Sequence, residues 1–247
     1  SGLLLATTNQ LTMDVAVVPF LWVVPLALYL VTFVLSFAGL YRQSVWRLGF
    51  LLGLGVMAVA GKEGVMASLG LQVAGTLAVL FPGCMLCHGE LARLAPRGRW
   101  LTAFYLTMSA GGATGGLLVA VVAPLVFPGL WELPVFLLAP YFLLLAIRWR
   151  APGGLGSPTE RRLAWVTSLA VVWLGVAAFI LPERHASSRF LAGTRNFYGV
   201  LTVRDDTGSG RTRMRRLEHG RVMHGTQFLA PSVRRMPTEY YAHGSGV

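Results

Sequence analysis

Two cysteines and a histidine end one apolar stretch, in a spacing that could attach haem. Cys84-Met-Leu-Cys87-His88 matches the C-x-x-C-H pattern, in which the cysteines form thioethers and the histidine ligates iron. The same residues fit an ordinary helix end, because a free cysteine behaves as a small buried hydrophobe. We favour this second interpretation, expect no disulfide between cysteines three residues apart, and predict no cofactor.

A glycine-rich tract, Ser109 to Gly116, could either cradle a phosphate or pack a helix. A phosphate loop needs Lys-Ser/Thr after its glycines, and here apolar residues follow. Small residues at four-residue spacing let helices approach closely in a bilayer. We therefore expect four glycines to form a packing face: Gly111, Gly112, Gly115 and Gly116.

Polar side chains elsewhere suggest local roles rather than catalysis. Thr8, Asn9, Gln10 and Asp14 precede the first long apolar stretch and could line a substrate path, but capping of a helix is favoured. Further along, Glu90 and His88 are expected to pair with Arg93.

The C-terminal part offers no evident site. Its histidines, His219, His224 and His243, are too widely spaced for a compact zinc site. Asp205 and Asp206 fall in a predicted turn, and none of the acids there has an evident partner.

Composition identifies the solvent that must surround most of the chain. Hydrophobic residues make up 55% of the 247 residues, charged residues only 13%, and the mean hydropathy is +0.62. Soluble domains carry about 25% charged residues. The chain is therefore predicted to be an integral membrane protein, mainly α-helical.

Apolar stretches predict about six transmembrane helices within a domain of residues 1–183. A helix needs ~20 mostly apolar residues to span a bilayer. The expected spans are 15–40, 48–61, 65–88, 101–127, 131–149 and 163–181. The second is short for a full crossing. Aromatic residues near the span ends fit the membrane interface: Tyr41, Trp46, Trp100, Trp131 and Trp149.

Arginines between the predicted spans indicate an orientation. The first, third and fifth connections carry nine arginines, whereas the second and fourth carry only Lys62. By the positive-inside rule, the arginine-bearing connections face the cytoplasm. This places both chain ends, and the segment after the last span, outside the cytoplasm. The alternative is a re-entrant second span, which would put the C-terminal part in the cytoplasm; Arg184, Arg189 and Arg195, close after the last span, favour that side, whereas the other arginines fit it poorly.

Residues 184–247 change in character and predict a small β-rich extramembrane domain. Strands are expected over 197–203, 214–219 and 221–229, with turns at 205–210 and at Gly220. Eleven arginines against four acids make this part strongly basic. A solvated basic face is favoured over a lipid or acidic partner, and nucleic acid is not expected.

Several segments together resemble bacterial spermidine-synthase-like proteins that carry a membrane domain. They are Leu3-Leu-Leu-Ala-Thr-Thr-Asn-Gln10 with Asp14 to Trp22, Cys87-His-Gly-Glu-Leu-Ala92, Phe104-Tyr105 with Ser109 to Gly112, Arg195-Asn-Phe-Tyr-Gly-Val-Leu201, His224-Gly-Thr-Gln227 and Pro237-Thr-Glu-Tyr-Tyr241. The resemblance covers nearly the whole chain.

This resemblance implies a polyamine aminopropyltransferase fold joined to the helices. Such enzymes transfer an aminopropyl group from decarboxylated S-adenosylmethionine to putrescine, and Gln227, Tyr240 and Tyr241 would lie on the polyamine side of the cleft. The family's nucleotide-binding half would follow Val247, so the chain is expected to be a piece of a longer product and inactive alone.

A second hypothesis comes from another class of protein. The chain could be a non-catalytic accessory subunit, held by other membrane subunits and lipids in a bioenergetic or photosynthetic complex. A diamine needs carboxylates to hold it, and the strongly basic C-terminal part would repel a dication.

Overall fold

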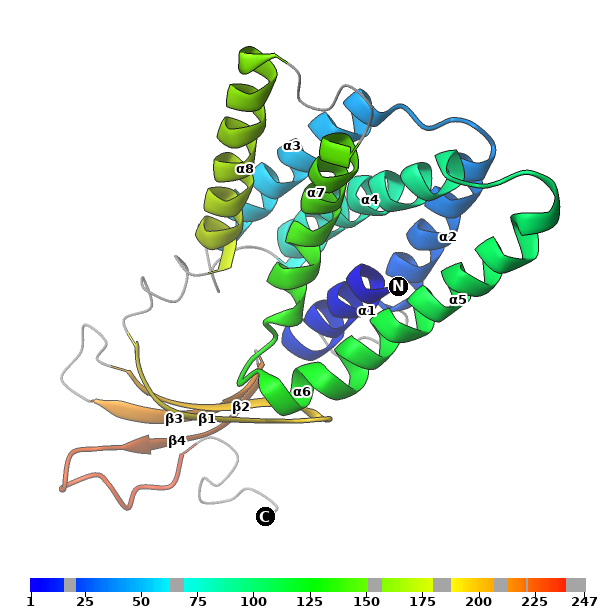
Figure 1. Ribbon diagram of the computed structural model, residues 1–247. Helices are drawn as coiled ribbons and strands as arrows, with labels where there is room; N and C mark the ends of the chain where they lie inside the picture. The colour runs from blue at the N-terminus through cyan, green and yellow to red at the C-terminus, as the bar shows by residue number, and fades with distance from the viewer. Residues whose placement is uncertain are drawn as a thin grey trace.

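The computed structural model describes residues 1–15, 21–62, 69–150, 157–179, 188–206, 213–220 and 222–238. It consists of a helical bundle with a four-stranded antiparallel sheet at one end (Figure 1). The helical elements are α1 (Gly2–Asn9), the π-helical segment η1 (Gln10–Val15), α2 (Val23–Phe37), α3 (Gln43–Lys62), α4 (Leu69–Arg93), the 3-10 turn η3 (Gly98–Trp100), α5 (Leu101–Leu117), the π-helical segment η4 (Leu118–Val122), α6 (Ala123–Val126), α7 (Glu132–Arg150) and α8 (Pro158–Phe179).

Helix α4 lies at the centre of the bundle and packs against α2 and α3. The buried core joins its Val79 and Leu80 to Phe50 of α3, Leu3 of α1 and Leu137 of α7. Pro82 lies inside α4, where neighbouring helices in a membrane protein compensate for the backbone hydrogen bond that proline removes. Its ring faces Gly49 on α3, where an added Cβ would lie 3.6 Å from it.

Three helical stretches of the described residues are long and apolar enough to cross a membrane: Gly70–Arg93, Gly98–Val126 and Glu132–Arg150. The last two match the expected spans 101–127 and 131–149. Helix α4 begins at Leu69 and continues beyond the expected end at His88 to Arg93, and residues 65–68 of that expected span lie outside the described residues. Outward-facing side chains on α5 and α6 include Leu106 and Leu125, which suit contact with lipid. These helices make the chain compatible with a membrane protein.

The prediction of six spans is not supported. Residues 16–20, with Pro19, lie outside the described residues, and α2 covers only fifteen of the expected residues 15–40. Helix α3 is longer than expected, but its apolar part is Gln43–Val59. Helix α8 opens with Glu160, Arg161 and Arg162 in its first two turns, so its charged end shortens the apolar part.

The sheet contains β1 (Ser188–Asn196), β2 (Gly199–Asp206), β3 (Met214–His219) and β4 (Val222–Phe228), paired in sequence order. Strands β3 and β4 match the expected ranges closely, and Gly220 turns between them with a φ of 58°. The expected strand 197–203 was misplaced. Phe197 and Tyr198 form the β1–β2 turn, because the Asn196 side chain accepts a hydrogen bond from the Tyr198 N–H at 2.9 Å.

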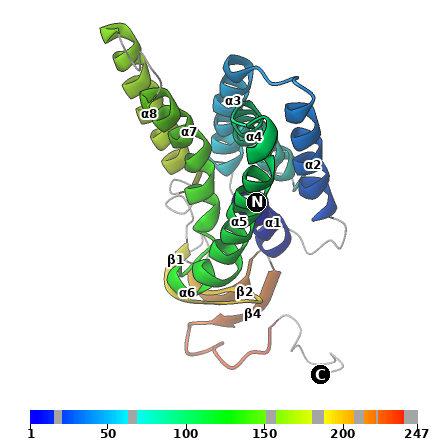
Figure 2. The same cartoon turned by 45° about the vertical axis from the view of Figure 1, so that its right-hand side comes forward.

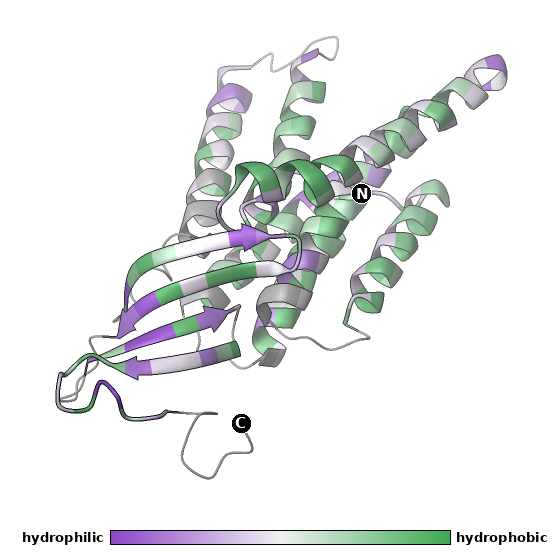
Figure 3. Cartoon of the chain, turned by 90° about the horizontal axis from the view of Figure 1, so that it is seen from below, coloured by the Kyte–Doolittle hydropathy of each residue, from purple (hydrophilic) through white to green (hydrophobic). Residues whose placement is uncertain are grey.

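The two ends of the helical bundle differ, because the sheet lies at only one of them (Figure 1). The C-terminal end of α7 and the N-terminal end of α8 lie at the end of the bundle away from the sheet, as do the α2–α3 and α4–α5 connections (Figure 1). Figure 2 shows α7 and α8 as a pair on one side, with the sheet below the bundle. Figure 3 shows the strands from below, with hydrophilic stretches among them and more hydrophobic helices behind.

Candidate functional site

The segment around His88 joins α4 to α2. The Thr32 hydroxyl lies 2.7 Å from the Tyr29 carbonyl, to which it can donate, and shares a hydrogen bond with His88 Nδ1 at 3.0 Å. The rings of Tyr29 and Phe33 meet the imidazole edge-on, with centroid distances of 4.7 and 5.4 Å. The expected pairing of His88 with Arg93 is therefore wrong, and His88 is a buried link between two helices.

The next residues of the same segment anchor the α2–α3 connection. Gly89 allows the Tyr41 ring to lie directly on α4, because any Cβ there would overlap that ring. Tyr41 then donates its hydroxyl to Glu90 Oε1 at 2.8 Å. Burial raises the pKa of Tyr41, and this hydrogen bond raises the pKa further. Arg93 pairs with the same carboxylate at 3.2 Å, as predicted.

A cavity of about 420 Å³ opens beside His88, between α1, α2, α4, α5 and α7. Apolar side chains form most of its wall, together with Tyr29 and both free cysteines, of which Cys84 is buried and Cys87 half-buried. The described residues contain no group of three histidine, cysteine or acidic side chains placed to hold a metal ion. The expected absence of a cofactor stays a prediction, and haem at Cys84, Cys87 and His88 stays its alternative.

The glycine tract divides into two pairs. A Cβ on Gly115 would lie 2.7 Å from Ser1 Oγ, and Gly116 lies beside Leu5, so α1 packs on these two. Gly111 and Gly112 have open space where a Cβ would project. Gly112 instead accepts a hydrogen bond from Ser1 Oγ at 2.6 Å through its carbonyl.

A buried ion pair attaches the sheet to the helices. Arg195 of β1 donates from Nη1 to Glu132 Oε2 at 2.9 Å and from Nη2 to Glu132 Oε1 at 2.7 Å. Their side chains are 4% and 1% exposed, and Arg195 also donates to the Gly129 carbonyl. Asn9 of α1 donates to the same carboxylate at 3.4 Å. Asn9 lies inside a continuous helical segment formed by α1 and η1, so its expected role as a helix cap is wrong. For Asp14 the structure describes the backbone but not the side chain, so its expected capping role stays a prediction.

The acids of the sheet all have arginine partners among the described residues. Asp205 accepts two hydrogen bonds from Arg215, at 2.8 and 3.2 Å, and Asp206 lies 2.6 Å from Arg216. Glu218 lies 3.8 Å from Arg204. For these three acids the prediction of no partner is wrong, and Asp205 and Asp206 lie in β2 and not in a turn. The register of β2 and β3 places Asp205 directly opposite Arg215, and Asp206 reaches Arg216 diagonally across the two strands.

The Asp205–Arg215 pair predicts that the sheet loses stability in acid. The hydrogen bond from Arg215 holds the pKa of Asp205 below its usual value. A lowered folded-state pKa stabilises the fold above the unfolded pKa of ~4, and this contribution is lost as the pH falls through the folded value. The protection factors of β2 and β3 amides, which correct hydrogen exchange for its intrinsic rate at each pH, should fall as the pH drops below about 4.

A matched pair of variants checks this assignment. Asp205→Asn should exchange faster at pH 7 and show less change in acid than the unmodified chain. Asp14→Asn, far outside the sheet in sequence, should leave the pH profile of β2 and β3 unchanged. An equal acid response in unmodified and Asp205→Asn chains would contradict the role of this pair.

The predicted polyamine residues are only partly described. Gln227 lies exposed on β4 opposite Arg215, so a cationic side chain is its cross-strand neighbour. Tyr240, Tyr241, Glu239 and His243 lie outside the described residues. His219 and His224 approach each other across the β3–β4 hairpin, with a centroid distance of 5.7 Å, which their sequence spacing did not suggest.

The ion pair was missed from the sequence because Glu132 and Arg195 are 63 residues apart. One signal was present: Glu132 begins an otherwise apolar stretch, where an isolated carboxylate in a membrane helix needs a partner. Comparison with known protein families, with characterised proteins and with solved structures finds no match for this chain.

Proposed function

We propose that this chain is the membrane domain of a spermidine-synthase-like protein and acts as a non-catalytic anchor. In this role, the helices hold the sheet at the periplasmic face of a bacterial inner membrane. The segments that resemble this family run through both the helices and the sheet, among them Cys87 to Ala92 and Arg195 to Leu201.

The observation that carries the proposal is the buried Glu132–Arg195 pair. It fixes the first strand to the start of α7 with bidentate geometry, which orients the strand as well as holding it. A sheet attached in this way keeps a constant position relative to the bilayer. This is what a membrane anchor must provide to a catalytic or binding domain.

The orientation follows from charge. The helix ends that carry or adjoin Arg93, Arg148 and Arg161 lie away from the sheet (Figure 1). Cytoplasmic connections carry an excess of arginine and lysine. The sheet then belongs on the opposite, periplasmic side.

The pairing of the acids supports a non-catalytic role. A diamine such as putrescine needs carboxylates to hold its two charges. Asp205, Asp206 and Glu218, the acids of the described sheet, already face arginines. The sheet thus offers a dication no unneutralised carboxylate among these three.

A second candidate is an accessory subunit of a larger bioenergetic or photosynthetic membrane complex. The exposed apolar surface of α5 favours it, because this surface could contact other subunits as readily as lipid. Migration in a complex well above the mass of the chain on a blue-native gel would support this candidate.

Two arms of one experiment test the anchor. In spheroplasts, a membrane-impermeant maleimide should label Tyr198→Cys, at the 85% exposed sheet turn, and label exposed Arg97→Cys only after permeabilisation. The unmodified chain, whose cysteines are buried or half-buried, is the blank. The reverse labelling pattern would overturn the orientation.

The second arm is an aminopropyltransferase assay on the purified chain with decarboxylated S-adenosylmethionine and putrescine. No turnover is expected. Spermidine formation above the heat-inactivated control would overturn the non-catalytic role, whichever way the labelling comes out.

A further inference from the structure

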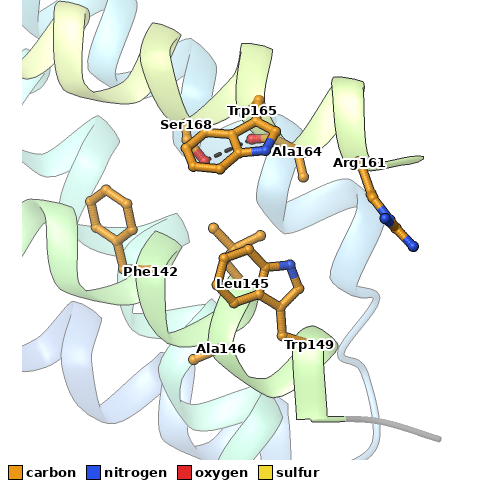
Figure 4. A pocket seen from close by; sticks show the side chains of 8 residues that line it. All are labelled: Phe142, Leu145, Ala146, Trp149, Arg161, Ala164, Trp165 and Ser168. Carbon is orange, nitrogen blue, oxygen red and sulfur yellow. Dashed lines mark hydrogen bonds between the residues drawn. The ribbon is translucent and has the colours of Figure 1, made fainter. Parts of the chain in front are cut away.

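A groove of about 520 Å³ lies between α7 and α8 (Figure 4). It runs toward the ends of these helices that lie away from the sheet (Figure 1). Phe142, Leu145 and Ala146 of α7 form one wall. Ala164 and Trp165 of α8 form the other. The only hydroxyl among its lining side chains, Ser168, donates to the Ala164 carbonyl at 2.7 Å, so the groove has an apolar character.

Polar bridges between the two helices hold these walls in place. Toward the sheet, the hydroxyls of Tyr141 and Thr167 share a hydrogen bond. Toward the outer end, Arg148 donates to Glu160 at 3.1 Å. The groove therefore lies between two side-chain hydrogen bonds that join α7 to α8, and these bonds fix the separation of its walls.

The outer end of the groove combines aromatic rings with positive charge. Trp149 and Trp165 lie on opposite walls with Arg161 beyond them (Figure 4). Tryptophan prefers the boundary between lipid tails and headgroups. Four arginines lie at these ends of α7 and α8: Arg148, Arg150, Arg161 and Arg162. Among the described residues of the same two helix ends, Glu160 is the one acid.

We propose that this groove binds one acyl chain of an anionic phospholipid, with the phosphate beside Arg161. The net positive end selects an anionic headgroup, and the apolar walls accept the chain. Trp149 to Phe142 spans seven residues, about 10 Å along a helix, which reaches roughly a third of the way into a ~30 Å hydrocarbon core. The two tryptophans mark where the glycerol region would sit.

Native mass spectrometry of the full chain tests this site. The chain is released from nanodiscs of equal phosphatidylglycerol and phosphatidylcholine, and retained lipid is counted. One phosphatidylglycerol should be retained in preference to phosphatidylcholine. Arg161→Gln should retain it about fivefold less, from ~1 kcal/mol for an arginine near an anionic surface. Arg97→Gln removes an equal charge from another exposed position and should change little.

A second pair of variants separates the groove from general charge. Ala146→Phe fills the groove at an exposed position and should reduce retention, whereas Ala110→Phe on the exposed face of α5 should not. Equal retention of the two lipids, or equal effects of Arg161→Gln and Arg97→Gln, would overturn the proposal. Loss of lipid in both alanine variants would also overturn it, since it would indicate an annular lipid without a site.

Discussion

Replacing Arg195 with alanine is expected to release the sheet from the helical bundle, at a loss of about 3–5 kcal/mol in the stability of their attachment. The substitution leaves the Glu132 carboxylate, which is 1% exposed, facing only the long hydrogen bond from Asn9. A buried charge without its partner is among the most destabilising changes that one substitution can make. Hydrogen exchange across β1 and β2, in detergent or nanodiscs, measures the effect.

A control on the same strand separates this effect from loss of positive charge. Arg189→Ala removes an exposed arginine from β1 and should change stability by no more than about 0.5 kcal/mol. Arg195→Lys should fall between these results, because an ammonium cannot reproduce the two parallel hydrogen bonds of the guanidinium.

A double variant tests whether charge pairing itself is responsible. Glu132→Leu with Arg195→Met removes both charges and keeps apolar volume at the joint. Buried ion pairs replaced in this way are often neutral or more stable. The double variant should therefore regain most of the loss. A double variant as unstable as Arg195→Ala would show that the shape of this joint matters and its charge does not.

Gly53→Ala is expected to destabilise the bundle by about 1–3 kcal/mol, because it forces α3 away from α4. A Cβ at Gly53 would overlap the Ala78 carbonyl oxygen and lie 2.9 Å from its carbon. These atoms belong to the backbone of the central helix and cannot rotate away. Unfolding of the purified chain in mixed detergent micelles, followed by circular dichroism, gives the difference in free energy.

Gly55 provides a matched control on the same helix. A Cβ added there would project into open space, with no neighbouring side chain or helix of the described residues within 4 Å. Gly55→Ala should therefore be neutral or gain up to about 1 kcal/mol from higher helix propensity. Opposite signs for the two substitutions are the expected result. Equal effects would contradict the close approach of α3 to α4.

Local patterns were sufficient for the chain's broad organisation. Scarcity of charge and long apolar stretches predicted membrane helices, and Glu132–Arg150 and Gly98–Val126 lie close to where they were expected. Alternation around Gly220 predicted the β3–β4 hairpin. Helix and strand formation depend on neighbours in the sequence, which is why periodicity and turn residues could locate them.

Tertiary structure decided which residues meet. Of the tract at Ser109, which was expected to pack helices, Gly115 and Gly116 lie against α1, whereas Gly111 and Gly112 face open space. Among the described glycines, the one where an added Cβ would meet another helix's backbone most closely is Gly53. His88 pairs with Thr32, fifty-six residues away, and Asp205 with an arginine on the next strand. Such partners depend on how helices cross and how strands register. Glu132 could be recognised from the sequence as a carboxylate needing a partner, but only the position of β1 beneath α7 identifies that partner as Arg195.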